Sequence, residues 1–259
     1  MALATDLGRG FTSNGRANSL TVFDLKTLKP VEEIKVTGEN PDAILYDPAT
    51  KRVFTFNGRS ENATVIDAVT GKVVETIPLG GKPEFATADF EGRVYVNLEN
   101  KSQVVAIDSR KAAVEHKWPL TPCEEPSGMA IDRAHRRLFI GCDNKLMAIV
   151  DATNGKVVAT VPIGEGVDAN GFDPGPALAY SSNGDGTLTV VHEDAPDKFT
   201  VIANVPTKPR ARTMAVDEKT HRVLLVTADF GPSPSPTADQ PHPRPPMVSD
   251  TFTVLVVGR

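Results

Sequence analysis

Three carboxylates occupy matching positions in a repeated sequence pattern, and together they suggest a site for a divalent cation. Asp42, Glu84 and Asp168 each lie five residues before an aspartate that recurs along the chain. If the repeats bring these positions together, the like charges raise the carboxylate pKa values unless a cation neutralises them. We therefore expect the three residues to bind an ion such as Ca²⁺ or Zn²⁺, and to be the catalytic groups if the protein is an enzyme.

Further polar residues are expected at the same end of the molecule, where they would bind a ligand. In other repeats the position that matches the three carboxylates is Met1, Ser127 or Arg212. Asparagines that end a strand, and an aspartate in an NGDG loop, add oxygen atoms nearby. The predicted ligand-binding residues are Asn14, Asn57, Ser127, Asn183, Asp185, Arg212 and His242. The alternative interpretation is that these carboxylates are simply solvated or pair with Arg212.

The histidines do not converge on the acidic positions. His135 and His221 fall in turns at the opposite end of the repeats, and only His242 is expected at the acidic end. A histidine-based zinc or copper centre, or a Ser–His–Asp triad, needs histidines beside its other groups. The sequence therefore predicts no histidine chemistry unless His242 reaches the site.

These positions are counted from an aspartate that recurs at intervals of 41 to 44 residues. The recurring residues are Asp6, Asp47, Asp89, Asp132, Asp173 and Asp217. Each follows a short apolar stretch and precedes a turn and an aromatic or aliphatic strand. A period of this length, with short strands and no long helical pattern, is typical of a β-propeller with one four-stranded antiparallel blade per repeat. The sequence predicts an all-β propeller in which six repeats are visible, the first and last of them incomplete.

A second aspartate follows the first by 18 to 20 residues in four repeats, at Asp24, Asp67, Asp108 and Asp151. Asp, Asn and Gly supply the hydrogen bonds and positive φ angles that tight hairpin turns need. Each blade therefore has strand A, the first aspartate, strands B and C, the second aspartate and strand D. We name the A–B and C–D turns the bottom end, and the B–C loops and the starts of the A strands the top end. Both aspartate series are predicted to be structural turn residues.

One domain is predicted for 1–259, with blades at approximately 1–37, 38–79, 80–120, 121–163, 164–206 and 207–259. The last blade offers strands A, B and C (TMAVD, VLLVTA and TFTVLVV), and the first lacks its usual lead-in. Either a six-bladed ring closes with a three-stranded blade, or the chain is part of a larger propeller. Because unpaired strand edges pair between chains, we expect a homo-oligomer formed through the incomplete terminal blades.

A proline-rich insertion at 230–250 separates strands B and C of the last blade. Seven prolines between Pro232 and Pro246 exclude a continuous strand or helix and favour extended polyproline II segments. At the top end the insertion would cover the channel as a lid or pack on a neighbouring chain. The alternative is a surface loop without a role.

Two cysteines belong to the fourth repeat. Cys123 precedes strand A and Cys142 ends strand B, and antiparallel neighbours place both sulfur atoms at the same top corner. We therefore expect a disulfide, which persists in an oxidising compartment such as the periplasm. A reactive thiol pair or a two-cysteine metal site is the alternative.

Three strand-B endings carry a resemblance to a known family. FTSN, FTFN and YSSN, at Phe11–Asn14, Phe54–Asn57 and Tyr180–Asn183, resemble the tyrosine–valine–threonine–asparagine motif of the YVTN family of bacterial propellers. The segments TVIDAVTGKVVETIPLG and AIVDATNGKVVATVPIG are similar to the hairpin that follows in the same repeat. The terminal asparagine is absent from YVNL, FIGC and LLVT in the other blades. The resemblance implies seven blades, export to the envelope and a missing N-terminal part, and little about chemistry.

Composition argues against several classes of partner. The net charge of −5, without a basic stripe, argues against nucleic acid. No apolar run approaches the ~20 residues of a membrane span, and no signal peptide precedes the first strand. The family resemblance and the expected disulfide nevertheless imply a periplasmic or secreted location for the parent protein.

Two functions remain. The first is a binding propeller of the bacterial envelope that presents its top end to a small molecule or a protein. The second is a metal-dependent hydrolase of phosphoesters, esters or lactones that uses Asp42, Glu84 and Asp168. This second function resembles that of the calcium-dependent propeller hydrolases, such as gluconolactonases, in which the ion polarises the scissile oxygen. No motif of those enzymes matches this chain residue by residue.

Overall fold

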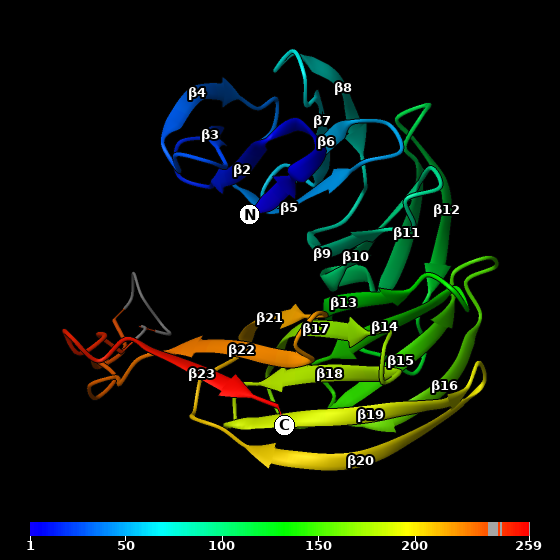
Figure 1. Ribbon diagram of the computed structural model, residues 1–259, viewed down its shortest axis with the longest axis vertical. Helices are drawn as coiled ribbons and strands as arrows, with labels where there is room; N and C mark the ends of the chain where they lie inside the picture. The colour runs from blue at the N-terminus through cyan, green and yellow to red at the C-terminus, as the bar shows by residue number, and fades with distance from the viewer. Residues whose placement is uncertain (238–242, 244, 259) are drawn as a thin grey trace.

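The computed structural model describes residues 1–237, 243 and 245–258, which form an all-β propeller of six blades (Figure 1). Within these residues, five blades are four-stranded antiparallel sheets and the sixth has three strands. The blades follow one another along an arc, with the first and sixth blades at its two ends (Figure 1). The fold class predicted from the sequence is confirmed.

Strands A to D run in order from the innermost to the outermost position of each blade. Blades one to three contain β1 (Ala2–Ala4), β2 (Arg9–Asn14), β3 (Ser19–Asp24), β4 (Pro30–Lys35), β5 (Pro41–Asp47), β6 (Arg52–Asn57), β7 (Asn62–Asp67), β8 (Val73–Pro78), β9 (Pro83–Ala88), β10 (Arg93–Leu98), β11 (Gln103–Asp108) and β12 (Ala113–Pro119). Blades four to six contain β13 (Pro126–Asp132), β14 (Arg137–Cys142), β15 (Leu146–Asp151), β16 (Val157–Pro162), β17 (Val167–Asp173), β18 (Leu178–Asn183), β19 (Thr187–Ala195), β20 (Lys198–Pro206), β21 (Thr213–Asp217), β22 (Arg222–Thr227) and β23 (Thr253–Val257). The described residues also form two short 3-10 helices, η1 (Thr5–Leu7) and η2 (Glu99–Lys101). Neither of these two helices has the length or the apolar character needed to cross a membrane.

The recurring aspartates close the turns at the bottom end. Asp47 ends β5, and its carboxylate accepts hydrogen bonds from the Ala49 N–H at 3.1 Å and the Thr50 hydroxyl at 2.8 Å. Asp67 ends β7 and accepts the Thr70 N–H at 2.7 Å. A carboxylate that satisfies the amides of a tight turn holds the hairpin in one geometry. These contacts agree with the structural role predicted for both aspartate series.

The hydrophobic core lies between the blades. Each of five clusters of buried side chains combines residues from two neighbouring blades. Strand β6 shows why, because Val53 packs with blade one and the next residue, Phe54, packs with blade three. Successive side chains of a strand point to opposite faces of its sheet. Burying Phe54 completely stabilises the fold by about 2 kcal/mol relative to an exposed ring.

Hydrogen bonds at the bottom end also connect neighbouring blades. Arg9 and Arg52, which begin strand B of blades one and two, donate from Nη1 to carbonyls in the next blade's C–D turn at 3.0 and 2.6 Å. Arg137 begins strand B of blade four and donates from Nε to the Pro196 carbonyl at 2.7 Å. These bonds hold the C–D turns of blades two, three and five against the preceding blade.

The sixth blade has an uncovered edge and an uncovered apolar face among the described residues. Strand β23 pairs with β22 on one side and with no described strand on the other. Val254 and Val256 are 49% and 57% exposed, whereas Leu255 and Val257 face blade five and join its hydrophobic cluster. No hydrophobic cluster of the described residues joins blade six to blade one.

The described part of the proline-rich segment between β22 and β23 contains no helix and no extended strand. An isolated β-bridge pairs Phe230 with Met247 at its base, where the Gly231 N–H donates to the Pro246 carbonyl at 2.9 Å. The Arg210 guanidinium lies 4.9 Å from the centroid of the Phe230 ring. This cation–π contact ties the base of the segment to the loop that precedes β21.

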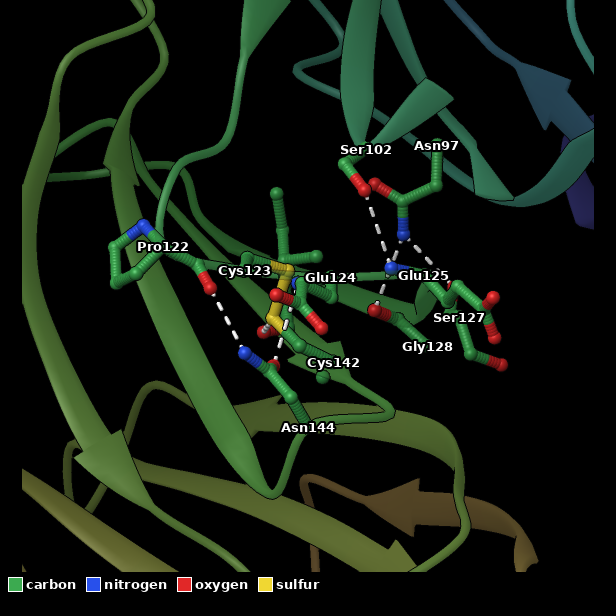
Figure 2. Close-up of a disulfide and its surroundings, with 12 residues drawn as sticks. Asn97, Ser102, Pro122, Cys123, Glu124, Glu125, Ser127, Gly128, Cys142 and Asn144 are labelled. Atoms are coloured by element: carbon green, nitrogen blue, oxygen red, sulfur yellow. Dashed lines mark hydrogen bonds between the residues drawn. A yellow bond between two sulfur atoms is a disulfide. The ribbon is translucent and has the colours of Figure 1, made fainter. Parts of the chain in front are cut away.

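Cys123 and Cys142 form the predicted disulfide in blade four (Figure 2). Both residues are buried, and the bond lies where Pro126 of β13 pairs with the last residue of β14. A disulfide is typical of proteins in oxidising locations outside the cytoplasm.

Replacing both cysteines with alanine is expected to lower the free energy of unfolding by about 3 kcal/mol, because the bond restricts the unfolded chain across a loop of roughly 20 residues. Urea unfolding of C123A/C142A and of the oxidised wild type measures the difference. The wild type treated with dithiothreitol is the control and should unfold at the same urea concentration as the variant. An unchanged midpoint in the variant would show that the bond adds no stability.

Candidate functional site

The predicted carboxylates line one pocket at the top end. Asp42, Glu84 and Asp168 are the second residues of β5, β9 and β17, and they surround a cavity of about 330 Å³. Ser127, the second residue of β13, lines the same cavity. Because all four occupy the same position in an innermost strand, the repetition of the blades brings them to one pocket.

Two of the three carboxylates pair with cationic side chains of the protein. Glu84 Oε1 lies 2.6 Å from Lys82 Nζ. Asp168 Oδ1 lies 3.6 Å from an Nη of Arg212, as the alternative interpretation of the sequence expected. Burial raises the pKa of Glu84, and the ammonium group of Lys82 opposes this shift. The negative charge of the pocket is therefore partly neutralised from within.

Asp42 is the carboxylate that is left for an incoming ligand. Its backbone carbonyl accepts a hydrogen bond from the Ser13 hydroxyl. The Met1 α-ammonium group lines the same pocket and is attracted by Asp42, but no side chain of the described residues forms an ion pair with the exposed Asp42 carboxylate. Phe85, which is 40% exposed, lines the same pocket with Ile44. An unpaired carboxylate beside an aromatic ring suits a small organic cation.

The described residues of the top end contain no group of three metal-ligating side chains with ligand atoms within 4.8 Å of one another. Asp42, Glu84 and Asp168 come from different blades around the axis, and two of them pair with Lys82 and Arg212. The predicted catalytic and metal-binding roles of the three carboxylates therefore stay predictions.

The asparagines that end strand B connect strands within their own blades and do not line the pocket. Each donates from its side-chain amide to two polar side chains at the start of strand C, at 2.8 to 3.2 Å. These bonds join Asn14 to Ser19 and Thr21, Asn57 to Asn62 and Thr64, and Asn183 to Thr187 and Thr189. Asparagine at this position thus closes the B–C loop.

Another predicted ligand-binding residue, Asp185, is also away from the pocket lining. Asp185 holds its own loop, because its carboxylate accepts the Glu165 N–H at 2.8 Å and the Thr187 N–H at 3.0 Å. His242 lies outside the described residues. Of the predicted set, the structure places Ser127 in the pocket and Arg212 beside Asp168.

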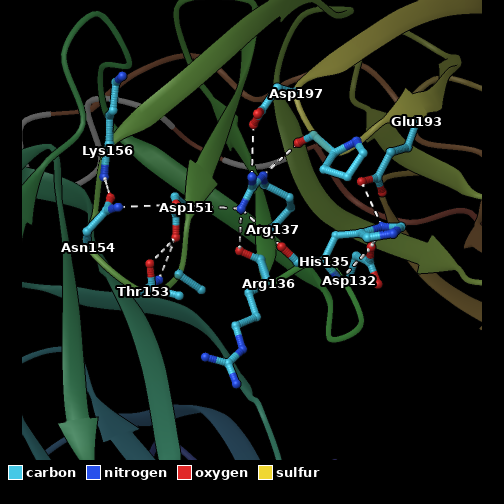
Figure 3. Close-up of polar contacts among 12 residues, drawn as sticks. Asp132, His135, Arg136, Arg137, Asp151, Thr153, Asn154, Lys156, Glu193 and Asp197 are labelled. Atoms are coloured by element: carbon cyan, nitrogen blue, oxygen red, sulfur yellow. Dashed lines mark hydrogen bonds and ion pairs between the residues drawn. The ribbon is translucent and has the colours of Figure 1, made fainter.

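A second polar cluster, at the bottom end, was not expected from the sequence (Figure 3). Asp132 ends β13, His135 lies in the turn that follows, and Glu193 belongs to β19 of the next blade. His135 Nδ1 lies 2.6 Å from Asp132 Oδ2 and 3.1 Å from Glu193 Oε1. His135 is away from the top end, as expected, but the neighbouring blade supplies a carboxylate that sequence spacing does not reveal.

Glu193 is a buried carboxyl group that has the His135 ring and the Asp132 carboxylate as close polar neighbours. Its residue is 6% exposed, and neither side-chain oxygen accepts a hydrogen bond from the described residues. Burial raises the pKa of Glu193 to about 7, and the Asp132 carboxylate acts in the same direction, while His135 and Arg137 oppose it. Such a group either keeps its proton near neutral pH or is balanced by a cation.

Comparison with known proteins supports the fold. No protein-family model and no curated protein sequence matches this chain. Among solved structures, hydrazine synthase from Kuenenia stuttgartiensis is 18% identical with a TM-score of 0.73, covering 87% of this chain and 75% of that chain. The RRP9 WD40 repeats are 8% identical with a TM-score of 0.77, covering 87% and 71%. The Swd1 β-propeller domain from Myceliophteria thermophila is 10% identical with a TM-score of 0.73, covering 87% and 77%. At these identities the likeness concerns the propeller fold alone.

The free energy of unfolding of the wild type is expected to fall as the pH rises, and Glu193→Gln is expected to abolish this part of the pH dependence. The pKa of Glu193 is about 7 in the folded protein and about 4.3 in an unfolded chain. The stability that the protonated group contributes is therefore present below about pH 4 and is lost as the pH rises through about 7. Between pH 5 and pH 8 the wild type should lose on the order of 2 kcal/mol more than the variant. Urea unfolding at both pH values in metal-free buffer measures this, and an equal pH dependence would contradict it.

Proposed function

We propose that this protein is a binding β-propeller whose top pocket takes a cationic group, carried by a small organic molecule or by a protein partner. The supporting observation is the exposed Asp42 carboxylate, which shares the pocket with the Phe85 ring. A cation between them would gain the attraction of the carboxylate and a cation–π contact of about 0.5–1 kcal/mol. The neighbouring carboxylates, Glu84 and Asp168, are paired with Lys82 and Arg212, so the proposal rests on Asp42.

The proposal includes a place in the cell and a family. The FTSN, FTFN and YSSN strand endings and their shared asparagine contacts support a relation to the YVTN propellers of the bacterial envelope. The disulfide between Cys123 and Cys142 supports an oxidising compartment, for which the periplasm is our proposal.

The alternative function is a metal-dependent hydrolase of phosphoesters, esters or lactones. It would need an ion shared by Asp42, Glu84 and Asp168. In the described residues, Glu84 pairs with Lys82 and Asp168 pairs with Arg212. No observation on the described residues favours hydrolysis over binding.

Asp42→Asn is expected to weaken the binding of small organic cations by about tenfold or more, because it removes the unpaired negative charge of the pocket. Isothermal titration of the wild type and the variant with arginine, putrescine and choline at low salt measures this. Glu218→Gln is the matched control, since it removes one negative charge from an exposed residue at the bottom end. The proposal fails if the wild type binds none of these cations, or if D42N binds them as tightly as the wild type.

We further propose that chains associate through the uncovered side of blade six. Val254 and Val256 project from β23 on the face that no described blade covers, and the outer edge of β23 has no described partner strand. Exposed backbone groups on a strand edge and apolar side chains beside it favour pairing with another strand.

The double substitution Val254→Lys and Val256→Lys is expected to convert an oligomer into a monomer, because it places two charges on the proposed contact. Size-exclusion chromatography with light scattering measures the mass of each protein. Val74→Lys, at an exposed valine of β8, is the control and should leave the oligomer intact. A wild type that stays monomeric at tens of micromolar would exclude this association.

A further inference from the structure

Blade four departs from other blades at one position of its A–B turn. The third residue after the first aspartate is a threonine in blades two and six, where the hydroxyls of Thr50 and Thr220 donate to the aspartate at 2.8 and 2.6 Å. In blade four this residue is His135, whose Nδ1 lies 2.6 Å from Asp132 Oδ2. The imidazole therefore stands where a threonine hydroxyl group makes the same contact with the turn aspartate in blades two and six. Unlike that hydroxyl, it is also a common metal ligand.

Blade five departs at the position that faces this turn. Equivalent residues in several blades share one backbone hydrogen bond. The residue that follows the second aspartate of the blade, or His192 in blade five, donates its N–H to the backbone carbonyl of the residue that precedes strand B. These bonds are Ala68 to Lys51, Ser109 to Gly92, Ala152 to Arg136 and Glu193 to Ala177, at 2.9 to 3.0 Å. Ala68, Ser109 and Ala152 are small and buried. The fold accommodates a methyl or hydroxymethyl group here, so the turn does not require the carboxylate of Glu193.

The two departures meet across the boundary between blades four and five (Figure 3). One ligand atom from each of Asp132, His135 and Glu193 lies within 4.8 Å of the others. Glu193 is 6% exposed, yet neither of its oxygens accepts a hydrogen bond from the described residues. A buried carboxylate that is not satisfied by hydrogen bonds is costly, and a bound cation removes that cost.

The nearest guanidinium group is already engaged elsewhere. Arg137 donates from Nε to the Pro196 carbonyl at 2.7 Å and from an Nη to Asp197 Oδ1 at 2.8 Å. A further Nη lies 3.7 Å from Asp151 Oδ2. Arg137 therefore attracts Glu193 from a distance but does not hydrogen-bond to its oxygens.

We propose that Asp132, His135 and Glu193 bind a first-row divalent cation, represented by Zn²⁺, between blades four and five. One imidazole nitrogen with two carboxylate oxygens is a donor set that Zn²⁺ accepts, whereas Ca²⁺ and Mg²⁺ prefer oxygen atoms alone. The pair of carboxylates balances the charge of the ion.

The geometry needs a small adjustment to take the ion. Ligand atoms at about 2.1 Å from a tetrahedral ion lie about 3.4 Å from one another. His135 Nδ1 is 2.6 Å from Asp132 Oδ2 and 3.1 Å from Glu193 Oε1, so the ring moves back by less than about 1 Å. The imidazole has room for this because its side chain is 49% exposed. Asp132 stays oriented by the Ala134 N–H, which donates to its other oxygen at 2.9 Å.

An ion at this place would connect two blades. Asp132 and His135 belong to blade four and Glu193 to blade five, so binding requires the folded arrangement of both. A ligand that binds only the folded state stabilises it by mass action. The site lies at the end of the molecule opposite to the top pocket and does not depend on the function proposed there.

The test uses variants that copy the other blades. Glu193→Ala installs the residue of blades two and four, and His135→Thr installs that of blades two and six, so both variants should fold. Isothermal titration of the metal-stripped proteins with Zn²⁺ is expected to show one ion per wild-type chain. Each variant should bind Zn²⁺ about tenfold more weakly or worse. The wild-type melting temperature should rise by several degrees at about a hundred times the dissociation constant.

His221→Thr is the matched control. His221 Nδ1 lies 2.9 Å from Asp173 Oδ2, but the described residues supply no third ligand there, so this variant should bind Zn²⁺ like the wild type. If Glu193→Ala fails to fold, Glu193→Gln replaces it, because it keeps the side-chain shape and removes the anionic oxygen.

Three results would overturn the proposal. One is a wild type that binds no Zn²⁺ at about 1 mM, where even a weak site would be filled. The second is Zn²⁺ binding that Glu193→Ala and His135→Thr leave unchanged. The third is tighter binding of Ca²⁺ or Mg²⁺ than of Zn²⁺ at this site.

Discussion

No blade of this propeller can bury its apolar residues alone, and the rest of the structure depends on that constraint. A strand such as β6 sends Val53 toward one neighbouring blade and Phe54 toward the other, so a blade needs its neighbours to bury its apolar residues. The five hydrophobic clusters of the described residues each span one blade boundary. The same constraint leaves Val254 and Val256 uncovered, because no described blade follows the sixth.

Packing between blades also creates both polar sites. At the top end it gathers the second residues of the A strands around one pocket. At the bottom end it brings a C strand of one blade against the A–B turn of the blade before it. The hydrogen bonds from Arg9, Arg52 and Arg137 to the next blade's C–D turn hold that contact. Each site therefore combines residues from more than one blade.

The two sites differ in how their carboxylates are neutralised and solvated. At the top, Lys82 and Arg212 pair with carboxylates that remain partly in water, so little free energy is stored there. At the bottom, Glu193 is removed from water, and its oxygens accept no hydrogen bond from the described residues, although the His135 ring lies close to one of them. Desolvation makes a buried charge far more costly than an exposed one. Binding of a proton or a cation is therefore more favourable at the bottom cluster than at the top pocket.

The sequence by itself determined the features that repeat or that are local. The recurring aspartates predicted the propeller, the order of strands within a blade and the turn contacts, because a turn is encoded by residues next to one another. The same count placed Asp42, Glu84, Ser127 and Asp168 at one pocket, and strand adjacency predicted the disulfide of Cys123 with Cys142.

Only the tertiary structure decided how residues of different blades meet. The asparagines of the strand-B endings turned inward to strand C, Lys82 and Arg212 took two of the pocket's carboxylates, and Glu193 reached His135 across a blade boundary. A repeat period tells which residues share a position, but it does not tell the angle and distance between blades. Those depend on how the side chains between the blades pack, and a single sequence does not display that packing.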